Sequence, residues 1–488
     1  MKTLVIAEKP SVARDIARVL GCAKKENGAL EGNQYIVTWA LGHLVTLKDP
    51  EDYDKKYKEW NMAVLPMMPE KLQIKVIPQT GKQYHAVTTQ LARKDVGEVV
   101  IATDAGREGE LVARWILDKA HNQKPCKRLW ISSVTDKAIR EGFASLKDAK
   151  EYDNLYRAAV SRAEADWLVG INATRALTCK YNAQLSCGRV QTPTLAMIAQ
   201  REQEIREFVP KPYYTVTAAA GGAVYTWKDE KSGGTRISDP EKAKQIAEKA
   251  KRYPLVLQKV EKKKKQKEAP LLYDLTELQR DASARFGYSA KQTLNLMQSL
   301  YETHKVLTYP RTDSRYLTKD IVPTLKERLD AVSIGPYKTL AQQAKRRPLK
   351  EKPGFVNDAK VSDHHAIIPT EQYVQLSALS NEERRIYDLV VRRFLAVLLP
   401  PCVYEETVIQ ASIEKECFTA RGKRMVEKGW QEAYEDNRYD DEDEAKEEVR
   451  EQNLPLLQAG MKFDQSKISL REGKTKPPAR FTEGTLLS

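Results

Sequence analysis

Short apolar runs alternate with helix-like segments near the N-terminus. An apolar run at residues 3–7 precedes apolar residues at helical spacing, and the same order recurs at residues 99–120. A third unit predicts a strand at 129–131 ahead of a helix at 135–146. Strands that alternate with helices are typical of a parallel sheet covered on both faces. We therefore expect an α/β domain over residues 1–150.

The pattern changes after that domain. Helical spacing predominates in residues 151–212. Alternating apolar and polar residues predict strands in 213–273, with Gly221-Gly222 as a hairpin turn, and strand-like sequence resumes in 400–473. Residues 274–399 between them return to helical spacing. Strands on both sides of a helical insert predict one β domain that the chain leaves and re-enters.

Two charged segments are expected to lie in solvent and to carry no chemistry. Lys262–Lys265 is a lysine run that predicts a mobile link, and residues 435–451 are acidic and predict a loop. Near the C-terminus, Thr482 and Gly484 ahead of two leucines predict the beginning of a helix.

Composition narrows the class of protein. A chain of 488 residues is long enough for about three domains. The net charge of +14 favours a polyanionic partner. No segment approaches the ~18 consecutive apolar residues of a membrane span, and the chain turns polar at Glu8, too early for a signal peptide. Six scattered cysteines without a C-x-x-C pair favour a reducing cytoplasm over a disulfide framework or a zinc ribbon.

Carboxylates follow two of the predicted strands. Glu8 comes directly after the first strand, and Asp104 and Glu108 follow the strand that ends at Ala102. Open α/β sheets bind ligands at the carboxyl ends of their strands, and Mg²⁺ takes one or two protein carboxylates together with substrate phosphate. Acidic turns in solvent are the ordinary alternative. The strand context favours a magnesium site at Glu8, Asp104 and Glu108.

A tyrosine with phosphate-binding neighbours stands at a chain break. Pro310 forces Tyr309 into an extended conformation, and Arg311 brings a planar positive charge suited to a phosphate. Residues 312–314 add hydroxyls and a carboxylate. This set suits a nucleophile directed at a phosphodiester. The alternative is a buried Tyr-Pro turn with a surface arginine.

Two further segments are candidates for binding phosphate. The polar turn at residues 186–191 precedes a helix with Pro193 in its first turn, and free N–H groups at a helix N-terminus bind phosphate. An ordinary helix start is the alternative. At His364 and His365, adjacent side chains point in different directions, so at most one of them is expected to face a site; a surface pair is the alternative.

Taken together in this order, five blocks resemble the type IA DNA topoisomerases, and the resemblance runs over the whole chain. The blocks are Glu8-Lys9-Pro10-Ser11, Asp104 to Glu110, Ser186-Cys187-Gly188-Arg189-Val190-Gln191, Tyr309 to Ser314, and His364 to Thr370. The first two are similar to the acidic motifs of a Toprim domain, the third to a DNA-binding segment, and the fourth to the catalytic tyrosine motif.

The family resemblance implies a multidomain fold that closes into a toroidal clamp. Its expected parts are a Toprim parallel-sheet domain at 1–150, a helical single-strand DNA-binding domain at 151–212 and 474–488, a β arch at 213–273 and 400–473, and a catalytic tyrosine domain at 274–399. Two features depart from the family pattern. Gly106 replaces an aspartate of the second acidic motif, which leaves open whether the site holds one or two metal ions. The chain also ends inside the helical domain. An incomplete copy that binds single strands weakly is therefore expected.

The resemblance also implies a reaction. Tyr309 would attack a phosphodiester of single-stranded DNA and form a 5′-phosphotyrosine, while Arg311 holds the scissile phosphate. His364 would hold a neighbouring phosphate or the backbone, and Glu8 or Lys9 would protonate the leaving 3′-oxygen. The chain has no G-x-x-x-x-G-K-S/T segment for ATP, and none is needed because the covalent link conserves the bond energy.

The expected substrates are single-stranded DNA and negatively supercoiled or catenated DNA, and the expected cofactor is Mg²⁺. A monomer at the nucleoid in the cytoplasm is expected, and a helicase partner is left open. Aromatic side chains would stack on bases while cations hold phosphates. The expected DNA-binding residues are Trp60, Arg162, Asp166, Ser186, Cys187, Gly188, Arg189, Val190, Gln191 and Arg311.

Two other functions share part of this pattern. A Toprim nuclease or primase would use the acidic motifs with water or a nucleotide as the nucleophile, and it would not need the segment Tyr309-Pro310-Arg311. A catalytically impaired single-strand-binding fragment is the other alternative, because of the early C-terminus. DNA labelled at either end is incubated with the protein, and the mixture is then denatured. The three candidate functions differ in whether label stays on the protein.

Overall fold

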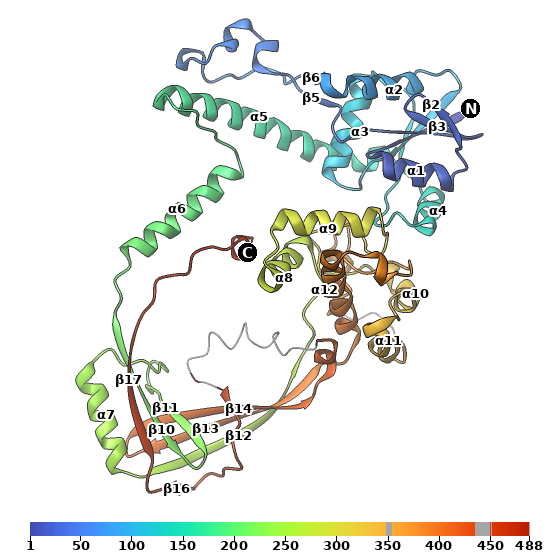
Figure 1. The fold of residues 1–488 in the computed structure, drawn as a ribbon. Helices are drawn as coiled ribbons and strands as arrows, with labels where there is room; N and C mark the ends of the chain where they lie inside the picture. Colours follow the sequence, from blue (N-terminus) through green and yellow to red (C-terminus); the bar gives the residue numbers. More distant parts are fainter. Residues whose placement is uncertain (348–353, 435–448, 450, 488) are drawn as a thin grey trace.

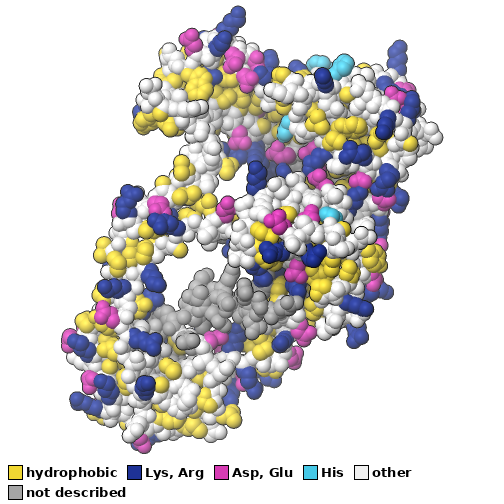
Figure 2. All heavy atoms as spheres, viewed as in Figure 1, with side chains coloured by type: hydrophobic (Ala, Val, Ile, Leu, Met, Phe, Trp, Pro, Cys, Tyr) yellow, Lys and Arg dark blue, Asp and Glu magenta, His cyan; other side chains and the backbone are white. Residues whose placement is uncertain are grey.

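A computed structural model describes residues 1–347, 354–434, 449 and 451–487. The acidic segment expected as a loop falls mostly on 435–448 and 450, outside these residues. The chain forms a ring with a broad opening, and a space-filling view keeps part of this opening clear (Figures 1 and 2). In the described part of the chain, no helix is long and apolar enough to cross a membrane.

The N-terminal region, residues 1–150, contains a seven-stranded sheet in the order β2-β3-β4-β1-β7-β8-β9. The central strands β4, β1, β7 and β8 run parallel, as expected, and helices cover the sheet (Figure 1). The strands are β1 (Lys2–Ala7), β2 (Lys24–Glu26), β3 (Ala29–Glu31), β4 (Tyr35–Trp39), β7 (Val96–Ala102), β8 (Cys126–Arg128) and β9 (Lys147–Asp148). The helices are α1 (Pro10–Val19), α2 (Gly81–Leu91), α3 (Arg107–Lys119) and α4 (Asp136–Ala144), and β5 (Val45–Leu47) pairs with β6 (Ile74–Val76) in a separate ribbon.

The strand expected at 129–131 is wrong in position. The paired strand β8 ends at Arg128, and residues 129–134 continue as an irregular segment, here called the strap. Sequence reading selected the apolar run, whereas the real strand ends on a charged residue. That residue can be buried because Glu110 pairs with it.

Two helices form the helical arm, residues 151–211. The helix α5 (Asp153–Tyr181) packs against α3, and α6 (Gln191–Glu207) leads down one side of the ring (Figure 1). None of the residues of α6 is buried. The arm therefore connects the N-terminal region to the β sheet with little packing of its own.

The arch is a sheet in the order β16-β12-β13-β14-β11-β10-β17, in which neighbouring strands are antiparallel, and the short strand β15 runs parallel to β14. Its first hairpin turns at Gly221 and Gly222, which both have positive φ, so this prediction is confirmed. The strands are β10 (Pro212–Ala220), β11 (Ala223–Trp227), β12 (Leu255–Lys267), β13 (Cys402–Ile413), β14 (Glu416–Glu427), β15 (Glu451–Gln452), β16 (Lys462–Phe463) and β17 (Lys467–Lys474). A helix that the sequence reading did not foresee, α7 (Pro240–Arg252), packs on β10 and β17.

The expectation of a mobile link at Lys262–Lys265 is wrong. These lysines lie inside β12 and pair in register with β13, where Lys263 faces Glu406 and Lys264 faces Glu405. Lys265 Nζ lies 2.5 Å from a carboxylate oxygen of Glu406. Carboxylates on the partner strand offset the like charges, a pairing that a single segment does not reveal.

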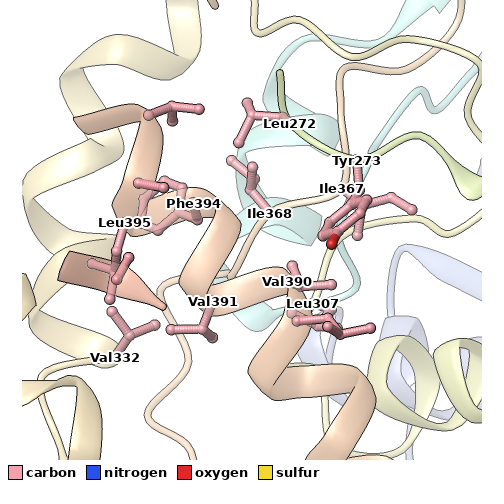
Figure 3. Close-up of a cluster of buried hydrophobic side chains, with 14 of the residues drawn as sticks. Leu272, Tyr273, Leu307, Val332, Ile367, Ile368, Val390, Val391, Phe394 and Leu395 are labelled. Atoms are coloured by element: carbon pink, nitrogen blue, oxygen red, sulfur yellow. The ribbon is translucent and has the colours of Figure 1, made fainter. Parts of the chain in front are cut away.

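The tyrosine region, residues 274–399, is built around the buried helix α12 (Asn381–Leu398) (Figure 3). Val390, Phe394 and Leu395 of this helix pack in the same apolar cluster as Leu307 and Ile368. The cluster fixes two extended segments side by side, and Thr308 N–H donates to the Ile368 carbonyl at 3.0 Å. The other helices are α8 (Leu275–Phe286), α9 (Ala290–Glu302), α10 (Leu325–Ala331) and α11 (Lys338–Lys345).

The C-terminal segment closes the ring. It leaves β17, follows the arm, where Arg480 lies 2.7 Å from Glu202, and ends in α14 (Glu483–Leu486) against α8 (Figure 1). Thr482 caps α14, which confirms the predicted helix beginning. Glu483 accepts a hydrogen bond from the N–H of Ala290 at 2.7 Å, so this segment also satisfies the first turn of α9.

Candidate active site

A cavity of about 1000 Å³ lies where the N-terminal region, the helical arm and the tyrosine region meet. Acidic and basic side chains gather along this junction (Figure 2). The cavity is lined by the ends of β1 and β7, by one face of α5 and by the segment after Leu307. The sequence-predicted residues that line it are Glu8, Asp104, Glu108, Arg162, Asp166, Tyr309, Arg311 and His364.

Tyr309 is held at the boundary between two regions. Its backbone N–H donates to the carbonyl of Ser132 at 2.9 Å, and its ring contacts those of His364 at 4.4 Å and Tyr301 at 5.5 Å. The side chain is 8% exposed. Burial, reinforced by the charge of Asp104, raises the pKa of Tyr309 above its usual value, and Arg311 opposes that rise. The phenol is therefore protonated at neutral pH and must lose its proton when it attacks.

Glu8 and Asp104 form a pair at the ends of adjacent parallel strands. Ala7 of β1 pairs with Ala102 of β7, and Glu8 Oε2 accepts a hydrogen bond from the N–H of Asp104 at 3.1 Å. Burial and then the charge of Asp104 raise the pKa of Glu8 to about 7. Burial also raises the pKa of Asp104. Two partly buried carboxylates at adjacent strand ends disfavour each other's negative charge, and a divalent cation would relieve this.

The turn that carries Asp104 requires a glycine at its end. A Cβ at Gly109 would lie 1.9 Å from the carbonyl oxygen of Asp104, so only glycine allows the first turn of α3 to come this close. At Gly106, in contrast, φ is 172°, and a Cβ would meet nothing within 4 Å. Glycine at that position is therefore not required by the backbone.

Glu108 points to the other side of the cavity. Its carboxylate lies 3.3 Å from Arg162 and 3.7 Å from His43, and the neighbouring His43 and Arg162 lower its pKa. Within the described residues, no group of three or more histidines, cysteines or acids is arranged to hold a metal ion. Glu8 and Asp104 therefore offer carboxylate oxygens of the kind that a divalent cation takes, while Glu108 is paired with basic neighbours.

The two basic residues beside the pair differ in their partners. Lys9 forms an ion pair with Glu302 at the end of α9, which joins the N-terminal region to the tyrosine region. Arg311 is exposed in the cavity, and no carboxylate of the described residues lies within ion-pair distance of it. A guanidinium without such a partner is available for bidentate binding of a phosphate.

His364 is buried between the two regions. Its Nε2 donates to the carbonyl of Ala105, and its Nδ1 lies 2.9 Å from the hydroxyl of Ser132. Burial lowers its pKa to about 4, so the ring is neutral and the Nδ1 accepts. His365 faces away, with its Nδ1 on the carbonyl of Ala366, as adjacent histidines were expected to do. In this arrangement His364 connects protein groups and is 3% exposed.

A fully buried ion pair supports the acidic turn. Arg128 Nε donates to Glu110 at 2.5 Å, and its other nitrogens donate to the carbonyls of Thr103 and Asp104 at 2.7 Å. Both side chains are completely inaccessible. The guanidinium therefore fixes the backbone on which Asp104 stands.

Replacing Glu110 with glutamine should strongly destabilise the N-terminal region, because it leaves the charge of Arg128 buried without a counter-ion. Breaking one partner of a buried pair costs about 3–5 kcal/mol. The midpoint of urea unfolding measures this effect. The control is Glu98→Gln, which removes a half-exposed partner of Lys127 and should cost less than about 1 kcal/mol. Equal midpoints for the two variants would contradict the prediction.

The predicted DNA-binding residues separate into three places. Arg162 and Asp166 line the cavity, and Arg189 beside them lies 2.5 Å from Asp166. The turn at 186–191 is exposed and is held to α5, since Cys187 N–H donates to the Thr174 hydroxyl at 2.9 Å. The last place is Trp60, which is 48% exposed on a separate lobe between β5 and β6, with the guanidinium of Arg175 5.1 Å from its ring.

Sequence reading missed several residues of the site. Glu302 and Ser132 contact predicted site residues across the boundary between regions, and such contacts have no local signal in the sequence. His43 follows the strand β4 by a few residues and was not singled out. A signal existed for Arg128, because an arginine next to an apolar run at a predicted strand suggests a buried partner.

Comparisons with known proteins agree with this geometry. A family described as DNA topoisomerase matches residues 150–488, and the Toprim domain family matches residues 3–134. DNA topoisomerase 3 of Bacillus subtilis (strain 168) is 59% identical over 487 residues, which cover 100% of this chain and 67% of that protein. DNA topoisomerase 3 of Bacillus licheniformis is 58% identical, with 100% and 66% covered.

A solved structure has the same fold. Full-length topoisomerase I from Thermotoga maritima superimposes with a TM-score of 0.72 at 23% identity, over 99% of this chain and 74% of that one. The expected combination of a Toprim parallel sheet with helical and β domains is therefore confirmed. The chain spans about two thirds of the length of the curated relatives it matches.

Proposed function

Since the chain belongs to the type IA DNA topoisomerases, we propose that it cuts and reseals one DNA strand through Tyr309, without ATP. One observation carries the proposal: Tyr309, Arg311 and the acidic pair line a single cavity, although they come from two regions of the chain, and Arg311 has no ion-pair partner among the described residues. This set contains a nucleophile, a phosphate-binding cation and groups for the leaving oxygen. The ring provides an opening through which a second strand would pass.

The proposed reaction is a reversible transesterification. The Tyr309 oxygen attacks the phosphorus, its proton leaves to solvent or a nearby base, and the bond to the 3′-oxygen breaks. Glu8 or Lys9 delivers a proton to that oxygen, and Arg311 holds the phosphate. Rejoining runs the same steps in reverse, so no external energy source is needed. His364 would contact a neighbouring phosphate or the DNA backbone only after its ring leaves the carbonyl of Ala105 or the hydroxyl of Ser132.

We also propose that the Toprim carboxylates bind Mg²⁺. A Toprim domain is generally a metal-binding domain, and the raised pKa values of Glu8 and Asp104 support a cation beside them. When bound there, Mg²⁺ would supply positive charge to the phosphodiester and the 3′-oxygen. Glu108 is a third candidate ligand, which would first have to leave Arg162.

The proposed substrates follow from the same site. Single-stranded DNA would enter the cavity along Arg162, Asp166 and the turn at 186–191, and strand passage would relax negative supercoils and separate catenated DNA. The proposed domains are those expected from the sequence, and the proposed state is a monomer at the nucleoid. A helicase partner is not part of the proposal.

One experiment tests the function directly. The protein is incubated with single-stranded DNA labelled at the 5′ or the 3′ end, denatured and separated by electrophoresis. A 5′-phosphotyrosine predicts that only the 3′-labelled fragment stays on the protein. Label free of protein after cleavage would favour a Toprim nuclease, and intact DNA would favour a non-cleaving single-strand-binding protein.

Arg189→Ala should weaken single-strand binding several-fold without abolishing cleavage at saturating DNA, because Arg189 lies beside the cavity on an exposed turn. For one lost phosphate contact, the slope of log affinity against log salt should become shallower by about 0.7. Fluorescence anisotropy over a salt series measures this slope. Arg206→Ala, at the far end of α6, is the matched control and should change it little. Identical slopes for both variants would show that Arg189 does not contact phosphate.

A further inference from the structure

Trp130 is an aromatic residue of the strap that has no part in the reaction proposed above. Its ring is stacked with two others, each at an interplanar angle of 16°: Tyr152, at 4.7 Å between ring centroids, and His364, at 5.9 Å. Its Nε1–H donates to the carbonyl of Asp363 at 3.0 Å, and the guanidinium of Arg128 lies 5.1 Å from the ring. One side chain thus joins the N-terminal region to the tyrosine region and to the residue that precedes α5.

The strap contacts His364 through two residues. The Trp130 ring covers one face of the imidazole, and the Ser132 hydroxyl contacts its Nδ1 at 2.9 Å. The Tyr309 ring lies at 4.4 Å from the same imidazole, and the carbonyl of Ser132 accepts the hydrogen bond from Tyr309 N–H. The closed position of the tyrosine is therefore supported by groups of the opposite region.

We propose that Trp130 is a positioning residue that stabilises the closed cleavage site by holding His364 beside Tyr309. The proposal rests on the proposed function and adds no chemical step. After cleavage, the 5′ end is bound to Tyr309 on the tyrosine region, and the 3′ end stays near the acidic pair on the N-terminal region. Passage of a second strand between these ends requires the two regions to separate.

The stack and the Nε1–H hydrogen bond of Trp130 both cross the boundary, so each separation breaks them and each rejoining restores them. The ring consequently sets the balance between the closed and the open forms of the covalent complex. A tryptophan that only filled the core of the N-terminal region would not donate its hydrogen bond to the tyrosine region. It would also not lie parallel to a histidine of that region.

The test compares cleavage and rejoining in the full chain. Trp130→Leu removes the flat ring and the donor, and the loss of one aromatic stack with one hydrogen bond shifts an equilibrium by about fivefold or more. We expect rejoining of a cleaved oligonucleotide to slow by about that factor and the covalent complex at equilibrium to increase, while cleavage changes less. Trp130→Phe keeps a ring for stacking and should recover most of the rejoining rate.

The control removes an aromatic contact of the same region away from the boundary. Phe143 on α4 contacts Tyr35 with ring centroids 5.7 Å apart, and Phe143→Leu should leave the ratio of rejoining to cleavage unchanged. Trp130→Met replaces Trp130→Leu if the latter does not fold, as judged by circular dichroism. If a folded Trp130 variant forms the adduct normally and rejoins DNA at an unchanged rate, this inference is wrong and the proposed function still stands. Absence of any adduct in the unmodified protein would overturn the proposed function and this inference with it.

Discussion

Replacing Tyr309 with phenylalanine is expected to abolish the covalent protein–DNA adduct and to leave single-strand binding intact. The substitution removes only the hydroxyl, so the ring contacts with His364 and Tyr301 and the hydrogen bond from the backbone N–H persist. Loss of a nucleophile lowers the rate of reaction by more than about 10⁴-fold. Denaturing electrophoresis with 3′-labelled DNA measures the adduct, and anisotropy measures binding.

Tyr301 provides a demanding control for this experiment. Its ring lies 5.5 Å from that of Tyr309, and it is equally buried in the same cluster. It lies inside α9, whereas Tyr309 stands two residues after Leu307 at an extended chain break. Tyr301→Phe should therefore still form the adduct. If Tyr309→Phe still formed the adduct and Tyr301→Phe did not, Tyr301 would be the nucleophile and the assignment to Tyr309 would be wrong.

The sequence was sufficient to predict the features of the site that depend on a few neighbouring residues. Glu8 and Asp104 were expected at the ends of parallel strands, and the pairing of β1 with β7 places them side by side. Tyr309, which Pro310 was expected to keep out of helical conformation, lies outside the helices and strands of the structure. These predictions succeeded because strand ends and X-Pro geometry are encoded within a few residues.

What could not be predicted depends on contacts between distant segments. Glu108 shares its turn with Asp104, yet it faces Arg162 of α5, and no local rule anticipates that partner. The lysines of β12 appeared to form a solvated link because the matching glutamates stand about 140 residues later on β13. For Arg128 the neighbouring apolar run indicated a buried partner, but it did not show that this partner is Glu110 from α3.

The position of the functional groups suggests how the two halves of the reaction divide between the two regions. Arg311 belongs to the tyrosine region and would stay with the phosphotyrosine, whereas Glu8 and Asp104 belong to the N-terminal region and would stay with the 3′ end. Ion pairs at Lys9–Glu302, Asp15–Lys305 and Lys137–Glu327 connect the regions in the closed form. Reclosure must therefore bring a phosphate and a hydroxyl back together across this boundary.

Removal of divalent cations should consequently affect rejoining far more than cleavage. Cleavage begins with DNA already held across the closed site, where Arg311 is available to the phosphate. Rejoining requires the 3′-hydroxyl to be aligned beside Glu8 and Asp104, whose raised pKa values show that the two carboxylates resist carrying their negative charges together, and a bound cation would stabilise the charged forms. With EDTA, relaxation of supercoiled plasmid should fall by more than about 100-fold, while adduct formation on a short single strand falls by less than about tenfold.

Two substitutions show which carboxylates produce this asymmetry. Asp104→Asn should reproduce the effect of EDTA, because it removes one carboxylate of the Glu8–Asp104 pair with little change in volume. Glu108→Gln should have the smaller effect of the two, since Glu108 is already balanced by Arg162 and His43. Rejoining is measured by trapping the adduct, adding Mg²⁺ and following the return of full-length DNA. If cleavage and rejoining decline equally in EDTA and in Asp104→Asn, the acidic pair serves both steps, and the division of labour between the two regions is wrong.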